Sequence, residues 1–150
     1  MLSQKAKYAL RALLMLAEQP EADMVMIADI AERENVPRKF LEAILVDLRK
    51  RGLLDSRRGK YGGYRLAKPA EAISFGEIIR IVDGPLAPLP CASKSGFRPC
   101  DDCTDVNSCS VRRLMLQVRN ATADILDNCS LADALKHRQA TGMLPGQFEI

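Results

Sequence analysis

The feature that most constrains the fold is the stretch from residue 27 to residue 66, which combines two short helical patterns with a glycine-bearing hairpin pattern. Ile27 and Ile30 share one face of a first helix, and a second apolar set recurs at helical spacing, namely Phe40, Leu41, Ile44, Leu45 and Leu48. Asn35 and Pro37 lie between them, where a capping residue and a proline at the first helical position are favoured. Because the break is short, the helices must cross steeply, as in a helix-turn-helix.

The residues after the second helix predict a wing. Gly52 suits a helix C-cap, and residues 53–58 and 64–66 have strand character on either side of a flexible turn at residues 59–63. A hairpin that follows the second helix of a helix-turn-helix is a wing. We therefore expect residues 1–84 to form a winged helix-turn-helix DNA-binding domain.

Positive charge is concentrated on this helix and wing. Residues 38–68 include ten Lys or Arg and three carboxylates, a net charge of +7, whereas the whole chain carries only +3. Binding to double-stranded DNA requires such a local concentration, because each phosphate contact releases condensed counterions. A solvated basic surface is the plainer alternative. The candidate DNA-binding residues are Arg38, Lys39, Phe40 and Glu42 for the major groove and Arg57, Arg58, Lys60, Tyr61, Gly62 and Gly63 for the wing.

Helical patterns flank the winged region. Ser3 can cap a first helix that runs to about Gln19, and Ser74 can cap a short helix that ends near Gly84. Aromatic residues make up only 5% of the chain and Trp is absent, which favours helix packing over a sandwich or barrel. We expect a mainly α fold: a winged helix-turn-helix with a two-stranded wing, followed by a cysteine loop and a long dimerisation helix.

Residues 85–110 lack apolar periodicity but include four of the five cysteines, Cys91, Cys100, Cys103 and Cys109. The apolar run at residues 8–17 is interrupted by Arg11, so we expect no signal peptide, no membrane attachment and a cytoplasmic location where thiols stay reduced. In such a reducing compartment, the four clustered thiols of residues 85–110 indicate metal ligation more than disulfides. Thiolate sulfur suits zinc or an iron–sulfur cluster, and the spacing does not separate the two. We interpret residues 85–110 as a sensor loop.

From residue 111 the apolar residues recur at alternating spacings of three and four, which predicts a long amphipathic helix. Pairing with the same helix of a second subunit would cover its stripe, and folding back onto its own domain is the alternative. The predicted dimer interface consists of Val111, Leu114, Val118, Ala121 and Ile125. This helix and a C-terminal helix occupy residues 111–140, and residues 141–150 are predicted to be a flexible tail.

Several motifs together resemble the Rrf2 (Rrf-two) family of bacterial winged-helix regulators, of the IscR and NsrR type, across about residues 1–135. They are residues 7–13 (KYALRAL), 27–33 (IADIAER), 40–42 (FLE), 48–53 (LRKRGL), 58–64 (RGKYGGY), 81–84 (IVDG) and 131–133 (LAD), with the clustered cysteines. The resemblance implies a homodimeric transcription factor that binds a palindromic operator, with repressor as the expected keyword. Many members hold an iron–sulfur cluster through three cysteines in the loop before the dimerisation helix.

Carried over by resemblance, the three cluster ligands are Cys91, Cys103 and Cys109. One branch of the family has a histidine as fourth ligand where this chain has Arg112, and another has an acidic residue where this chain has Lys7. Cys100 is therefore the candidate fourth ligand. The expected cofactor is a two-iron two-sulfur cluster, with a four-iron four-sulfur cluster or zinc as alternatives.

The DNA-binding regulator is weighed against other functional classes. An enzyme is not expected, because the chain has one histidine, no phosphate-binding lysine motif and no paired carboxylates in a cleft-like setting. A DNA-binding regulator with a structural zinc site, or one that senses through thiols alone, is the alternative to a cluster protein. A zinc module that binds a protein partner is a third class, and metal analysis would distinguish it.

Overall fold

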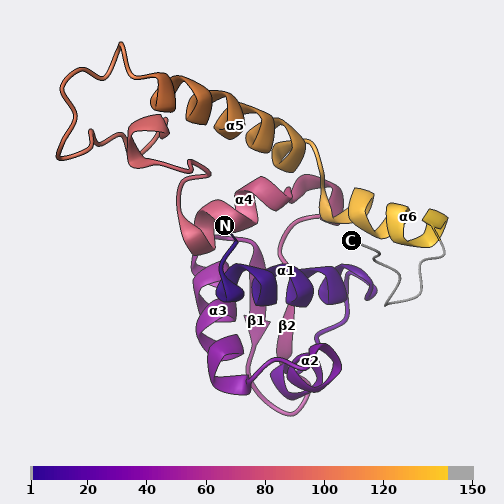
Figure 1. Cartoon of the computed structure of the whole chain (residues 1–150). Coiled ribbons are helices and arrows are strands. Elements are labelled where there is room, and N and C mark those ends of the chain that lie inside the picture. Colours follow the sequence, from indigo (N-terminus) through magenta and orange to yellow (C-terminus); the bar gives the residue numbers. More distant parts are fainter. Residues whose placement is uncertain (1, 142–150) are drawn as a thin grey trace.

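The computed structural model describes residues 2–141, and Figure 1 shows one long helix lying to one side of a group of shorter helices and a two-stranded sheet. The predicted tail, residues 141–150, lies outside the described residues apart from Thr141, which is the last residue of the C-terminal helix. In chain order the elements are α1 (Gln4–Ala17), α2 (Ile27–Glu34), α3 (Arg38–Lys50), β1 (Leu54–Arg57), β2 (Gly63–Leu66), the 3-10 turn η1 (Ala70–Ala72), α4 (Phe75–Asp83), the 3-10 turn η2 (Pro90–Ala92), α5 (Ser110–Asp127) and α6 (Leu131–Thr141). The mainly α fold with a two-stranded wing is confirmed.

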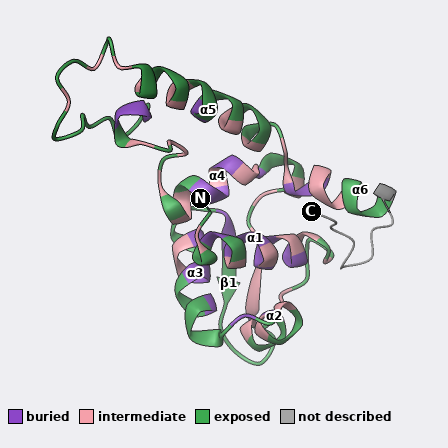
Figure 2. Cartoon of the chain, viewed as in Figure 1, coloured by how far each residue is buried: buried purple, intermediate pink, exposed green. Residues whose placement is uncertain are grey.

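Helix α1 is the centre of the core, because it contacts α2, α3, α4, α6 and β2. Ser3 caps it as predicted, with its hydroxyl accepting from the Ala6 amide at 3.0 Å. Leu13 of α1 and Leu45 of α3 are completely buried, and Figure 2 shows buried segments, in purple, on α1, α3 and α4. Each such leucine stabilises the fold by roughly 1.5–3 kcal/mol relative to exposure.

The turn between α2 and α3 has the short geometry that a helix-turn-helix needs. Asn35 ends α2 in the left-handed region, with φ of 50°, where asparagine is tolerated better than most residues. Pro37 is the N-cap of α3, one position before the first helical position that we predicted. Leu41, Ile44 and Leu48 then anchor one side of α3 in the core and leave its other side exposed.

The wing is an antiparallel pair in which Leu54 lies opposite Leu66 and Arg57 lies opposite Gly63. A backbone bridge that the sequence pattern does not predict extends this sheet. The Val25 amide donates to the Tyr64 carbonyl at 2.9 Å, and the Tyr64 amide donates to the Val25 carbonyl at 2.8 Å. The segment before α2 therefore holds the wing at a defined position relative to the helix-turn-helix.

Helices α4 and α5 connect the winged unit to the cysteine loop. Ser74 caps α4 by accepting from the Glu77 amide at 3.1 Å, as its capping-box pattern predicts. Residues 84–109 then form a long connection that contains η2, which packs against α5. Across the described residues, no helix has the length and apolar character needed to cross a bilayer.

Candidate nucleic-acid interface and cysteine loop

The exposed side of α3 carries the residues predicted to enter the major groove. Arg38, Lys39, Phe40 and Glu42 are all exposed, and Phe40 has 63% of its surface accessible. The Nε atom of Arg38 lies 3.1 Å from Glu42 Oε1, an ion pair one helical turn apart. This pair orients both side chains on the first turn of α3, where residues of a recognition helix contact base edges.

Helix α3 and the wing present cations that have no carboxylate partner in the described part of the chain. Lys39, Arg57, Arg58 and Lys60 are exposed and form no ion pair within residues 2–141, whereas Arg65 pairs with Asp55 at 3.5 Å. A hollow of about 360 Å³ separates α3 from the wing, and its lining includes Arg49, Arg57 and Arg58. Unpaired cations on both sides of a hollow suit an anionic backbone.

The backbone of the wing requires glycine at two positions. A Cβ atom on Gly62 would collide with the backbone carbonyl of Arg57, and one on Gly63 would collide with the carbonyl of Val25. Gly63 also has φ of +135°, which L side chains rarely adopt. These glycines let the turn close and bring β2 against the segment before α2. The adjacent Tyr61 is 81% exposed, with the Lys60 Nζ 5.6 Å from its ring centroid.

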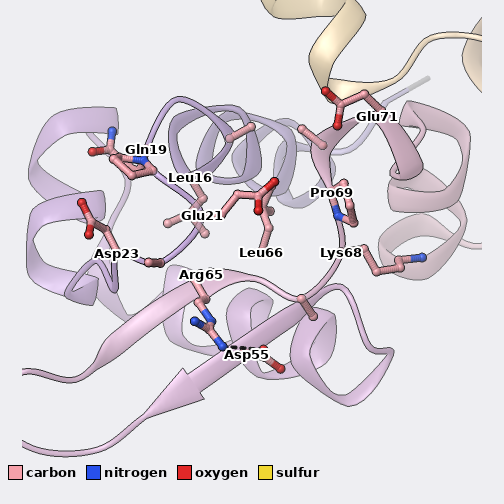
Figure 3. Close-up of a pocket in the computed structure, with 15 residues that line it drawn as sticks. Leu16, Gln19, Glu21, Asp23, Asp55, Arg65, Leu66, Lys68, Pro69 and Glu71 are labelled. Carbon is pink, nitrogen blue, oxygen red and sulfur yellow. Dashed lines mark hydrogen bonds and ion pairs between the residues drawn. The ribbon is translucent and has the colours of Figure 1, made fainter.

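A larger hollow of about 510 Å³ lies between the α1–α2 connection, the base of the wing and η1 (Figure 3). Its charged lining includes Glu21, Asp23, Asp55 and Glu71 together with Arg65 and Lys68. Arg65 is paired with Asp55, and Lys68 pairs with Glu77 at 3.0 Å. Carboxylates outnumber cations there, so this hollow is less suited to phosphate than the face formed by α3 and the wing.

The four predicted ligand cysteines are distributed along the connection between α4 and α5, residues 84–109. Cys91 is buried in η2, Cys100 is exposed, and Cys109 is the N-cap of α5. The neighbouring Cys91 thiol is the main cause that raises the pKa of the Cys100 thiol, and Asp102 and Cys103 contribute further in the same direction. Within residues 2–141, no three His, Cys, Asp or Glu side chains are gathered closely enough to hold a metal ion.

The predicted dimer stripe lies on the outer side of α5. Val111, Leu114, Val118 and Ile125 are among the exposed large hydrophobic residues, with Ile125 at 70%. Ala121 is exposed on the same side. Beside Val118, a hollow of about 520 Å³ has a mainly apolar lining from the N-terminus, α4, residues 85–88 and α5, including Leu2 and Leu126. The stripe is therefore not covered by the chain's own winged unit.

A basic recognition helix held beside a basic wing defines a DNA-binding protein of the winged helix-turn-helix class. The sequence model of the Rrf2 protein family, which is described as an iron-dependent transcriptional regulator, matches residues 2–137. The chain therefore belongs to the Rrf2 family of transcriptional regulators, as the sequence motifs predict.

Relatives and solved structures agree with this assignment. The rrf2-like HTH-type transcriptional regulator of Rhodobacter capsulatus is 45% identical over 138 residues, covering 90% of this chain and 92% of the relative. IscR of Escherichia coli is 33% identical over 138 residues, covering 92% and 82%. Among solved structures, IscR of T. potens has a TM-score of 0.75 at 29% identity, covering 97% and 93%. CymR of B. subtilis, named as a global cysteine regulator, has a TM-score of 0.74 at 30% identity, covering 91% and 97%.

Proposed function

We propose that this chain acts as a homodimeric, sequence-specific DNA-binding regulator whose cysteine loop binds an iron–sulfur cluster. The observation that carries the DNA-binding part is a group of exposed cations on α3 and the wing that form no ion pair within residues 2–141 and include Lys39, Arg57, Arg58 and Lys60. In this proposal residues 1–84 bind DNA, residues 85–110 sense the signal and residues 111–140 form the dimer.

Each part of the DNA-facing surface has a distinct role in the proposal. Arg38, Lys39, Phe40 and Glu42 read base edges in the major groove, where the carboxylate of Glu42 can accept from a cytosine amino group. Arg57, Arg58 and Lys60 bind phosphates or enter the minor groove, and an arginine in a narrow groove adds selectivity without a base contact. Tyr61, Gly62 and Gly63 shape the wing tip.

A two-fold symmetric pairing through α5 accounts for its exposed stripe. Such a pairing would place two wings about one helical turn of DNA, or a small multiple, apart, which matches a palindromic operator. The apolar hollow beside Val118 supports this arrangement, because a second copy could bury it together with the stripe.

The donor chemistry of the loop fits a thiolate-bound group. Cys91 and Cys100 are already neighbours, and Cys103 is close enough to influence Cys100. When bound, a cluster supplies one-electron redox chemistry and reactivity towards oxidants and nitric oxide.

One observation favours an iron–sulfur cluster over zinc or thiol-only sensing. The family is described as iron-dependent, which is a reason to expect iron in this chain. Cys91, Cys103 and Cys109 are the proposed ligands, with Cys100 as the fourth. A two-iron two-sulfur cluster needs no ligand beyond these four thiolates, and a four-iron four-sulfur cluster could use the same four.

Anaerobic purification followed by iron, sulfide and zinc analysis and an absorption spectrum tests the cofactor. Selection from a random pool of DNA duplexes tests the DNA-binding part, and Arg58→Ala then tests the interface. We expect Arg58→Ala to weaken DNA binding. It should also reduce, by about 1, the steepness with which the logarithm of the DNA association constant falls with the logarithm of the salt concentration. Lys136→Ala removes the same charge from exposed α6 and is the matched control. Failure to enrich any sequence, or equal effects of both variants, would contradict the proposal.

A further inference from the structure

Arg112 forms hydrogen bonds at both ends of the cysteine loop. Its backbone amide donates to the Sγ of Cys109 at 3.4 Å, which is the N-cap bond of α5. Its side-chain Nε donates to the backbone carbonyl of Cys91 at 2.9 Å. Arg112 therefore contacts two proposed ligands that are eighteen residues apart in the sequence.

The residues around η2 are arranged so that this contact is supported. The Arg98 amide donates to the Pro90 carbonyl at 3.3 Å, which closes residues 90–98 into a compact loop. Phe97 is thereby brought to α5, and its ring centroid lies 5.8 Å from the guanidinium carbon of Arg112. A guanidinium over an aromatic face is attracted by the ring quadrupole. Cys91 is only 4% exposed beneath this arrangement.

We propose that Arg112 is a positioning residue that fastens Cys91 to the first turn of α5 and supplies a positive charge beside the metal group. The fastening requires no metal, so the start of α5 stays connected to η2 in the metal-free protein. The charge matters once a cluster is bound, because net charge and hydrogen bonding around the sulfurs set the reduction potential of such a group. The second part of this inference rests on the proposed cluster, and the first does not.

The first arm of the test uses metal-free, reduced protein. It measures the rate at which iodoacetamide alkylates Cys91, which is followed by mass spectrometry of peptides. Arg112→Gln should make Cys91 react about fivefold faster, the opening expected when one hydrogen bond to the loop is lost. Arg113→Gln is the matched control, since Arg113 is the exposed neighbour on the same helix and carries the same charge. Equal Cys91 rates in wild type and Arg112→Gln would overturn the fastening.

The second arm uses protein loaded with iron and sulfide and measures the midpoint potential of the cluster. Arg112→Gln should lower the potential, because the reduced cluster has one more negative charge to be stabilised. A tenfold change in the ratio of oxidised to reduced cluster corresponds to about 59 mV for a one-electron couple. Arg112→Lys should retain most of the wild-type potential if charge is the cause. An unchanged potential in Arg112→Gln would overturn the tuning.

The two arms separate the failure of this inference from failure of the proposed function. If wild-type protein binds no iron and sulfide, the cluster proposal is wrong, and the alkylation arm still decides whether Arg112 fastens the loop. If the cluster forms with the same yield in all variants but neither rate nor potential changes, the cluster proposal stands and the role of Arg112 is wrong.

Discussion

Asp127, in the last turn of α5, accepts two hydrogen bonds from the guanidinium of Arg80 on α4, at 2.6 Å and 2.9 Å. The two-point geometry fixes the end of the proposed dimerisation helix on the winged unit. The connection is reinforced beside it, where the Phe75 amide donates to the Cys129 carbonyl at 3.0 Å and the Leu131 amide donates to the Ile73 carbonyl at 2.9 Å. The end of α5 is therefore joined to α4 by side chains and backbone together.

The hydrogen bonds from Arg80 lower the pKa of Asp127, and the same contact raises the pKa of Arg80. A carboxylate whose pKa is lowered by folding stabilises the folded state above its unfolded pKa, and this stability is lost as the pH falls through the folded pKa. Both side chains are about 40% exposed, so solvent screening limits the contribution to about 1 kcal/mol. We expect Asp127→Asn to reduce the free energy of unfolding by about this amount at pH 7.

Urea unfolding of Asp127→Asn and wild type at pH 7, and at decreasing pH below the ordinary aspartate value of about 3.9, checks this expectation. The difference between the two proteins should shrink as the acid protonates Asp127 in the wild type. Asp124→Asn removes the same charge from an exposed position on α5, one turn away, and should have little effect. A difference that stays constant from neutral to acid pH would contradict the role of this carboxylate.

Gly76, in the first turn of α4, lets Asp127 reach Arg80. A Cβ atom at this position would collide with Asp127 Oδ1 and lie 2.9 Å from Arg80 Nη1. We therefore expect Gly76→Ala to displace the carboxylate and weaken the ion pair. Alanine is otherwise preferred to glycine in a helix by about 1 kcal/mol, so the same change should stabilise the protein when Asp127 is already alanine.

A double-mutant cycle of Gly76→Ala and Asp127→Ala, measured by urea unfolding, tests the coupling between these two positions. The expected result is a more favourable effect of Gly76→Ala in the Asp127→Ala background than in the wild type. Additive effects would show that the space at Gly76 is unrelated to the ion pair.

Short-range sequence patterns predicted the helices well. The apolar spacing in α3 and the capping residues Ser3 and Ser74 act within one or two helical turns. Contacts between distant segments could not be predicted in the same way. The bridge from Val25 to Tyr64 joins residues thirty-nine apart and leaves no periodic signal. Periodicity also pointed to the outer stripe of α5, whereas Arg112 lies on the inner side, where its partner Cys91 is defined only by the folded loop.

Base recognition by Glu42 gives a prediction for sequence preference. We expect Glu42→Ala to relax the preference at one base pair of each half-site, with a loss of discrimination of about 1–3 kcal/mol there. Phosphate contacts should persist, because Arg57, Arg58 and Lys60 are unchanged. Affinity for a panel of duplexes with single-base substitutions checks this, with Glu71→Ala, on η1, as a control for the change in charge. An unchanged profile across the panel would exclude Glu42 from base readout.

Pairing through the outer stripe of α5 gives a prediction for assembly. Val118→Asp would bury a charge in the proposed interface, so we expect monomers that bind palindromic DNA poorly. Asn120→Asp places a carboxylate two residues away, on an exposed position well outside the stripe, and should leave the assembly intact. Analytical ultracentrifugation at low micromolar concentration distinguishes the two variants. A Val118→Asp dimer under these conditions would refute the interface.

The cysteine loop, α5 and the winged unit form a continuous path along which a cluster could change DNA affinity. Arg112 and Cys91 connect the loop to the start of α5, and Arg80 and Asp127 connect the end of α5 to α4, which packs on α1 and α3. Ligation by Cys91, Cys103 and Cys109, with Cys100 as fourth, would add a further constraint on the start of α5 to the Arg112 contact and so alter the separation of the two wings.

Loss of the cluster through oxidation, nitric oxide or iron shortage should therefore change DNA affinity, by a coupling of about 1–3 kcal/mol. Affinity for one operator at one salt concentration is compared for cluster-loaded protein, metal-free protein and Cys103→Ala. Cys103→Ala should behave like the metal-free protein, because removing one ligand prevents stable cluster binding. Cys129→Ala, which alters the cysteine outside the loop, should behave like wild type. Equal affinities of the loaded, metal-free and Cys103→Ala forms would leave the four loop cysteines with a structural role and assign the sensed signal to another part of the molecule.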